Sequence, residues 1–124
     1  MSTMDRTRFI GGSDVAAILG VSPWKSPFRL YQEKTGAYVE EITLAKQRIF
    51  DRGHRWEPVV VEMLIDELQD RGHDVQIIAR NARYLDRDFP YLACELDLEL
   101  RIDGEEHNAE IKTVSPFAAK AWGE

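Results

Sequence analysis

Residues 96–113 read LDLELRIDGEEHNAEIKT, and this stretch decides the expected fold. Through residues 96–102, leucine and isoleucine alternate with charged side chains, which is the period of two of a β-strand with one buried face. Asp103-Gly104 is a strong signal for a two-residue hairpin turn. Residues 108–113 are then expected to pair back on the first strand. The stretch therefore predicts an antiparallel β-hairpin.

Three charged side chains are expected to gather on this hairpin: Asp97, Glu110 and Lys112. Alternation along a strand places Glu110 and Lys112 on one face, about 6.6 Å apart. Asp97 belongs to the neighbouring strand, so its carboxylate and that of Glu110 are expected to reach one divalent cation. Two carboxylates, a cation and a lysine suit the hydrolysis of a phosphodiester bond. The spacing alone leaves open that these are solvated side chains on an exposed sheet face.

The segments that precede the hairpin predict helices. Ser13 is expected to cap a short helix from Asp14 to Leu19, and Gly20 to end it. Ser26-Pro27 is expected to open a second helix, because proline is tolerated at the first helical position, and Gly36 to close it.

A longer helix is expected from about Thr43 to Arg71. Its apolar side chains recur every four residues, at Trp56, Val60, Leu64 and Leu68. Gly53 is expected to bend this helix or to separate two helices, and Gly72 to end it. Core packing is the expected role of Trp24 and Trp56.

Residues 75–79 and 81–85 predict one strand or two short ones, and residues 86–90 predict a turn. The order of elements predicts an α/β fold in which N-terminal helices are followed by a mainly antiparallel mixed sheet. We expect one domain over residues 1–124. A sheet that stops at an unpaired edge is a poor end for a domain, so we also expect the chain to be truncated at its C-terminus.

Composition limits the class of protein. The chain has 124 residues, 44% of them hydrophobic, a formal net charge of −6 and one cysteine. The net charge neither supports nor excludes a nucleic-acid substrate, because the local distribution of charge matters more than its sum. Cys94 is expected to be a small buried hydrophobe in a reduced cytoplasm. No stretch is apolar enough for a membrane span, and we expect no membrane partner.

Four short motifs follow one another along the chain. They are IGGSDVAAILG at 10–20 with SPW at 22–24, RGHRWEP at 52–58, ACELD at 93–97, and EIKT at 110–113. In this order they resemble the motifs of YqaJ-like viral recombinases, which are phage-type exonucleases related to lambda exonuclease. The resemblance implies a PD-(D/E)XK nuclease with a restriction-endonuclease-like core.

The resemblance also implies roles for single residues. Asp97 and Glu110 would bind Mg²⁺, which Mn²⁺ can replace, together with the backbone carbonyl of Ile111. Glu57 would assist the metal site from the long helix. Lys112 would position or activate the attacking water.

Further expectations concern the substrate and the partners. Arg6 and Ser13 fall at places comparable to those that hold the 5′-phosphate in lambda exonuclease. Glu95 departs from the family pattern, since it stands where lambda exonuclease has a phosphate-contacting serine. The resemblance implies 5′-to-3′ digestion of linear duplex DNA in phage recombination, in the cytoplasm of a bacterial host. It also implies a single-strand annealing protein as partner and a homo-oligomeric assembly.

Two rival functions stay open. The chain is alternatively a non-catalytic, partner-dependent DNA-binding fragment of such a nuclease. A carboxylate-pair hydrolase such as a glycosidase is the other rival, and it would need no metal ion. Lys112, two residues after Glu110, weighs against the glycosidase.

Overall fold

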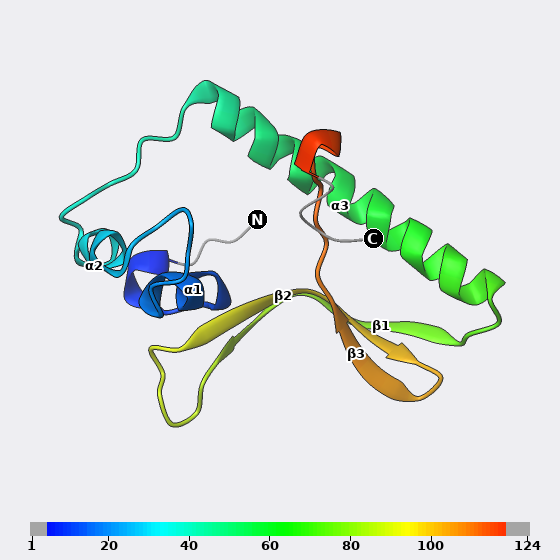
Figure 1. The fold of residues 1–124 in the computed structure, drawn as a ribbon. Helices are drawn as coiled ribbons and strands as arrows, with labels where there is room; N and C mark the ends of the chain where they lie inside the picture. The colour runs from blue at the N-terminus through cyan, green and yellow to red at the C-terminus, as the bar shows by residue number, and fades with distance from the viewer. Residues whose placement is uncertain (1–4, 119–124) are drawn as a thin grey trace. The chain divides into compact units, whose positions relative to one another are not determined.

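The computed structural model describes residues 5–118, and these form two units. The N-terminal unit comprises the residues up to 42 together with 81–96. The helix–hairpin unit comprises residues 43–80 together with those from 97 onward. Figure 1 shows the order of the elements along the chain.

Short helices make up much of the N-terminal unit. Its helical elements are η1 (Arg6–Arg8), η2 (Gly12–Asp14), α1 (Val15–Ile18) and α2 (Pro27–Thr35). α2 begins with Pro27 at its first position, as predicted, and Ser26 caps it, because the Ser26 hydroxyl accepts a hydrogen bond from the Arg29 N–H at 3.1 Å. Gly36 follows α2 with φ of 78°, in the left-handed conformation that favours glycine at a helix end.

The prediction that Ser13 caps the first helix is wrong. Ser13 lies inside the 3₁₀ turn η2, directly before α1, so helical backbone begins upstream of it. The side chain that holds this turn is Asp14, which accepts a hydrogen bond from the Gly11 N–H at 3.0 Å. A carboxylate is the stronger acceptor for a free N–H at this position.

The helix–hairpin unit begins with one long helix, α3 (Leu44–Asp70). The Thr43 hydroxyl caps it by accepting a hydrogen bond from the Lys46 N–H at 3.2 Å, and Gly72 follows its end with φ of 90°. The alternative in which Gly53 separates two helices is wrong, since α3 runs through both Gly53 and Pro58. Packing along one face outweighs the low helix propensity of these two residues.

The buried face of α3 agrees with the predicted one at Leu64 and Leu68 but not at Trp56. Val61 is 3% exposed, and Leu64, Ile65 and Leu68 pack around it. Trp56 is 51% exposed and Trp24 is 92% exposed, so the expected core role of both tryptophans is wrong. The four-residue spacing identified the helix. A second row of apolar residues, at Val61 and Ile65, lies beside the predicted row, so the spacing did not decide which side of the helix faces the core.

Three strands form one sheet in the order β1-β2-β3. They are β1 (Val75–Leu85), β2 (Ala93–Ile102) and β3 (Glu105–Ala109). β1 is a single strand, in which Asn81 has φ of 51° and interrupts the extended backbone. The predicted turn after it is confirmed, because the Asp86 carboxylate accepts hydrogen bonds from the N–H groups of Asp88 and Phe89.

The β2–β3 hairpin closes at Asp103-Gly104, as predicted. Both residues have positive φ, 51° and 86°, as a tight hairpin turn requires. The expected strand 108–113 is wrong in its bounds, since β3 covers Glu105–Ala109. The two-residue turn lets pairing begin at Ile102 opposite Glu105, and the ladder stops after Ala109.

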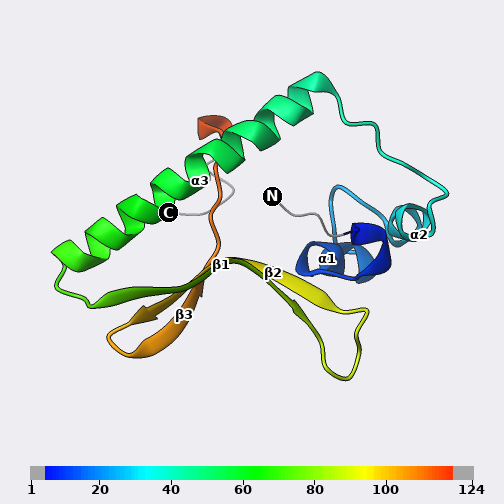
Figure 2. The same cartoon turned by 180° about the vertical axis from the view of Figure 1, so that it is seen from behind.

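The core of the helix–hairpin unit lies between α3 and the hairpin. Leu98 and Leu100 are 0% and 2% exposed and form one buried cluster with Val61. The alternation that predicted one buried face of β2 is therefore confirmed. Both views of the fold show α3 running along one side of β3 (Figures 1 and 2).

A polar contact fixes the hairpin turn to the residues that follow α3. The Asp103 carboxylate lies 2.6 Å from His73 Nδ1 and accepts a hydrogen bond from the Asp74 N–H at 2.8 Å. These hydrogen bonds hold the pKa of Asp103 below its usual range, with His73 as the larger cause.

The observed elements are helices followed by an antiparallel sheet, which confirms the predicted α/β class. Cys94 is exposed, so the prediction that it is buried is wrong. None of the helices in the described part of the chain has the length and apolar character to cross a membrane.

Candidate functional site

Strand register brings Asp97 and Glu110 to the same level of the hairpin. Leu98 pairs with Ala109 in the antiparallel ladder, so the next pair along would join Asp97 and Glu110. Directly opposed residues of antiparallel strands share a face of the sheet. The hairpin geometry thus agrees with the expected neighbourhood of the two carboxylates.

The backbone of the next residue bonds directly to one of these carboxylates. The Ile111 N–H donates a hydrogen bond to Asp97 Oδ2 at 2.9 Å, where a continued ladder would use a backbone carbonyl. Asp97 therefore anchors the segment that carries Glu110 and Lys112. This contact also explains why β3 ends before the predicted boundary.

Glu110 and Lys112 lie on one side of that segment. Lys112 Nζ is 2.8 Å from Glu110 Oε1, and both side chains are about half exposed, 56% and 55%. The sequence-based expectation that these two side chains share a face is consistent with this contact. The amine sits close to the carboxylate and stays accessible to a ligand from solvent.

Glu57 reaches the same region from α3. It lies one helical turn before the buried Val61 and is partly buried itself. Burial raises the pKa of Glu57 above its usual value, and the nearby carboxylates of Asp97 and Glu110 raise it further, against an opposing effect of His54. The charges of Asp97 and Glu110 therefore act on Glu57 in addition to its burial, and both make the ionised form of Glu57 costly.

α3 and the segment after β3 approach each other at Gly53. A Cβ atom at Gly53 would lie 3.6 Å from the Thr113 hydroxyl oxygen, which is ordinary van der Waals contact. Gly53 is one turn before Glu57 on the same face of α3. A side chain larger than alanine here would push residues 110–113 away from Glu57.

The donor set suits a hard divalent cation, although the side chains do not yet surround one. Carboxylate and carbonyl oxygens are the ligands that Mg²⁺ and Mn²⁺ prefer. Over residues 5–118, no three His, Cys, Asp or Glu side chains converge into a ready ion site. Asp97 Oδ2 accepts a hydrogen bond from the Ile111 N–H and Glu110 Oε1 pairs with Lys112 Nζ, so one oxygen of each carboxylate is engaged by a protein group. A bound cation would require a rearrangement of these side chains.

The predicted phosphate-binding residues, Arg6 and Ser13, belong to the N-terminal unit. Both side chains are exposed. Sequence reasoning missed Lys34, whose amine donates hydrogen bonds to the carbonyls of Arg6 and Phe9 and pairs with Asp14 at 3.0 Å. Lys34 holds together the two turns that carry Arg6 and Ser13. No spacing in the sequence signals this role, because the contacts span 20 to 28 residues.

Glu95, the departure from the family pattern, is also in the N-terminal unit. Its side chain is 20% exposed and lies 3.5 Å from the guanidinium of Arg83. The acid therefore has a counter-charge from the neighbouring strand, which explains how it is tolerated in a partly buried position.

Comparisons with known proteins agree with the order of motifs. The family model of the YqaJ-like viral recombinase domain matches residues 3–124. The chain is 29% identical over 119 residues to "Uncharacterized protein YqaJ" of Bacillus subtilis (strain 168). That match covers 96% of this chain and 34% of the relative, so the chain spans about a third of the relative's length. No solved structure matches the chain significantly.

Proposed function

The chain belongs to the YqaJ-like viral recombinase domain family, a family of recombination-associated nucleases, and from this we propose that it hydrolyses DNA with a divalent cation. The residues that we propose for the reaction all come from the helix–hairpin unit: Glu57, Asp97, Glu110, Ile111 and Lys112. The observation that carries the proposal is the contact of Asp97 with the backbone of Ile111, which places an acid of β2 beside the Glu110-Ile111-Lys112 segment.

The ligands of the cation would be oxygens. We propose the carboxylates of Asp97 and Glu110 and the backbone carbonyl of Ile111, with Glu57 assisting from α3. Mg²⁺ or Mn²⁺ would act there as a Lewis acid on the phosphoryl oxygens and would lower the pKa of a coordinated water. The pKa of Glu57, which is raised first by burial and then by the charge of Asp97, supports this choice, because a nearby cation would favour the ionised form against both effects.

Lys112 has a different role. Its amine is 2.8 Å from Glu110 Oε1, within reach of a phosphate that approaches the same carboxylate. An ammonium at this place can orient the attacking water and stabilise the negative charge that develops on the phosphate. We therefore propose Lys112 as a catalytic residue and not as a ligand of the cation.

The substrate and the partners of the whole protein are also proposals. We propose linear duplex DNA, digested from the 5′ end in phage recombination in a bacterial cytoplasm, together with a single-strand annealing protein. Arg6 and Ser13 are proposed to contact the terminal phosphate, and a homo-oligomer is proposed as the assembly. The family and the order of its motifs support these proposals.

Digestion of labelled DNA tests the function. Wild type with Mg²⁺ should degrade linear duplex, while Glu110→Ala should not, and closed circles should resist if the enzyme needs an end. Retardation of DNA in a gel without any cleavage would favour the non-catalytic, DNA-binding alternative. Cleavage of closed circles would make the protein an endonuclease.

A further inference from the structure

An arginine-rich stripe runs along the outer face of the first half of α3. It consists of Arg48, Arg52 and Arg55, with Trp56 and Val59 beside them, and these residues line an open hollow of about 600 Å³ together with Asp51. At 100° per residue, Arg55 lies about 160° round the helix from Glu57. The stripe is therefore on the opposite side of α3 from the proposed catalytic acids.

All three arginines are exposed, and none forms an ion pair with any residue from 5 to 118. The acid of the hollow, Asp51, accepts a hydrogen bond from the Gln47 amide at 2.9 Å. Past Val59 the same side of the helix becomes acidic, at Glu62 and Asp66, so the positive stripe has a defined end.

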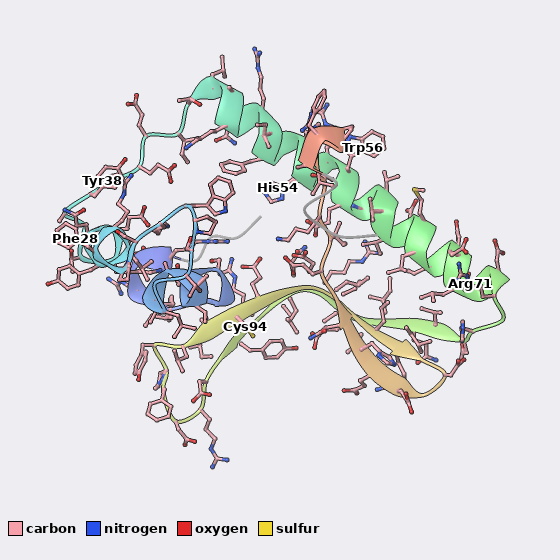
Figure 3. All side chains as sticks on the ribbon, viewed as in Figure 1. Phe28, Tyr38, His54, Trp56, Arg71 and Cys94 are labelled. Atoms are coloured by element: carbon pink, nitrogen blue, oxygen red, sulfur yellow. The ribbon has the colours of Figure 1, made fainter. Side chains whose placement is uncertain are left out.

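The apolar side chains of the stripe indicate what kind of anion it fits. Trp56 is 51% exposed and Val59 is 40% exposed, so an indole face and an aliphatic surface stand beside the guanidinium groups. Figure 3 shows Trp56 on the side of α3 that faces away from β3. Arginine binds phosphate in a bidentate manner, and exposed aromatic rings stack on unpaired bases. An acidic protein segment would use the charges but would leave the indole without a matching partner.

We propose that the outer face of α3 binds a single-stranded segment of nucleic acid, with its phosphates on Arg48, Arg52 and Arg55 and a base on Trp56. This proposal rests on the proposed function, both in taking nucleic acid as the substrate class and in taking one strand of a duplex as the strand that is hydrolysed. Because the stripe faces away from Glu57, the strand that it binds is one that is not being hydrolysed. A nuclease that degrades one strand of a duplex leaves such a strand beside it.

Binding without hydrolysis tests this proposal. A fluorescein-labelled oligothymidylate is titrated with the full chain in EDTA. Its length of about 12 nucleotides lies within the site sizes of single-strand grooves. Changing the three stripe arginines to glutamine should abolish most of the binding and reduce the salt slope by about 2, since each phosphate contact contributes about 0.7 for single strands. Trp56→Leu should weaken binding about tenfold, which corresponds to the loss of one base stack.

A matched control removes the same charge elsewhere. Changing Arg71, Arg87 and Arg101 to glutamine should leave the affinity within about twofold of wild type. Equal loss in the control and the stripe variant would overturn the proposal, as would competition by poly-glutamate as strong as that by the oligonucleotide. Unchanged affinity for the oligonucleotide in the variant with glutamine at the three stripe arginines would overturn the proposal as well. Cleavage of duplex in Mg²⁺ is scored separately, so a failed nuclease and a failed stripe give different results.

Discussion

The Ile111 N–H donates its hydrogen bond to the carboxylate of Asp97 across 2.9 Å, at the point where the β2–β3 ladder ends. The Asp97 side chain thereby ends the β2–β3 ladder, and it stands beside the segment that carries Glu110 and Lys112. A residue with both tasks should show two separable effects on substitution, one on folding and one on activity.

Asp97→Ala and Asp97→Asn separate these effects. Alanine leaves the partly buried Ile111 N–H without an acceptor and should lower the free energy of unfolding by about 1–3 kcal/mol. Asparagine keeps an acceptor oxygen and should stay within about 1 kcal/mol of wild type, yet it should lose cleavage of duplex DNA because it lacks the charge. Urea unfolding and digestion of the same preparations measure both. Wild-type digestion by Asp97→Asn would rule out a role of this carboxylate in the reaction.

Glu57→Gln should change how stability depends on pH. The folded state raises the pKa of Glu57 above the unfolded value of 4.5, chiefly through burial. The stability that this group contributes is therefore fully present below pH 4.5 and is lost as pH rises through the folded pKa. Glutamine does not titrate, so the variant should gain stability relative to wild type as pH rises. Urea unfolding between about pH 4 and pH 7 measures the difference; a difference that shrinks with pH would contradict the environment described for Glu57.

Gly53 should tolerate alanine and reject a larger side chain. Alanine makes an ordinary contact with the Thr113 hydroxyl oxygen and should stabilise α3 by up to about 1 kcal/mol. Leucine should displace residues 110–113 from Glu57 and reduce DNA cleavage at least about tenfold, which corresponds to a misplacement of reacting groups. Thermal unfolding and digestion rates of the two variants are compared. Full activity of Gly53→Leu would show that the close approach of α3 and this segment is unimportant.

Asp103→Asn should weaken the turn of the hairpin at neutral pH. The folded state lowers the pKa of Asp103 below its ordinary value of 3.8 through its hydrogen bonds with His73 and Asp74. The stability from the ionised carboxylate is present above that value and is lost as pH falls through the folded pKa. Wild type and variant should therefore converge in acid. Asp66→Asn, an exposed position on α3, is the control, and an equal effect of both substitutions would show that the His73 contact contributes nothing.

Much of this unit was readable from the sequence because its signals are local. The alternation in 96–102 and the turn at Asp103-Gly104 fixed the hairpin, since both depend on neighbouring residues. The hairpin in turn predicted that Asp97 and Glu110 lie close together on neighbouring strands, with which the observed register agrees. The starts of α3 near Thr43 and of α2 at Ser26-Pro27 were readable for the same reason.

What could not be read depends on contacts between distant segments. β3 ends early because a side-chain carboxylate of β2 takes the Ile111 N–H, and no pattern within 105–113 shows this. The inner face of α3 is the one that packs against Leu98 and Leu100 of β2. Because these contacts join distant segments, the prediction that Trp56 lies inside was wrong. Lys34 was missed because its carbonyl partners lie at least 25 residues away along the chain.

Calorimetric titration with Mn²⁺ tests the central claim, that Asp97 and Glu110 together hold a divalent cation beside Lys112. Wild type should bind Mn²⁺, and Asp97→Asn and Glu110→Gln should each lose most of that binding. Lys112→Ala should keep it, because removing the amine frees Glu110 Oε1, while cleavage should disappear. Mn²⁺ binding that is absent from wild type, or that is unchanged in both carboxylate variants, would contradict the claim.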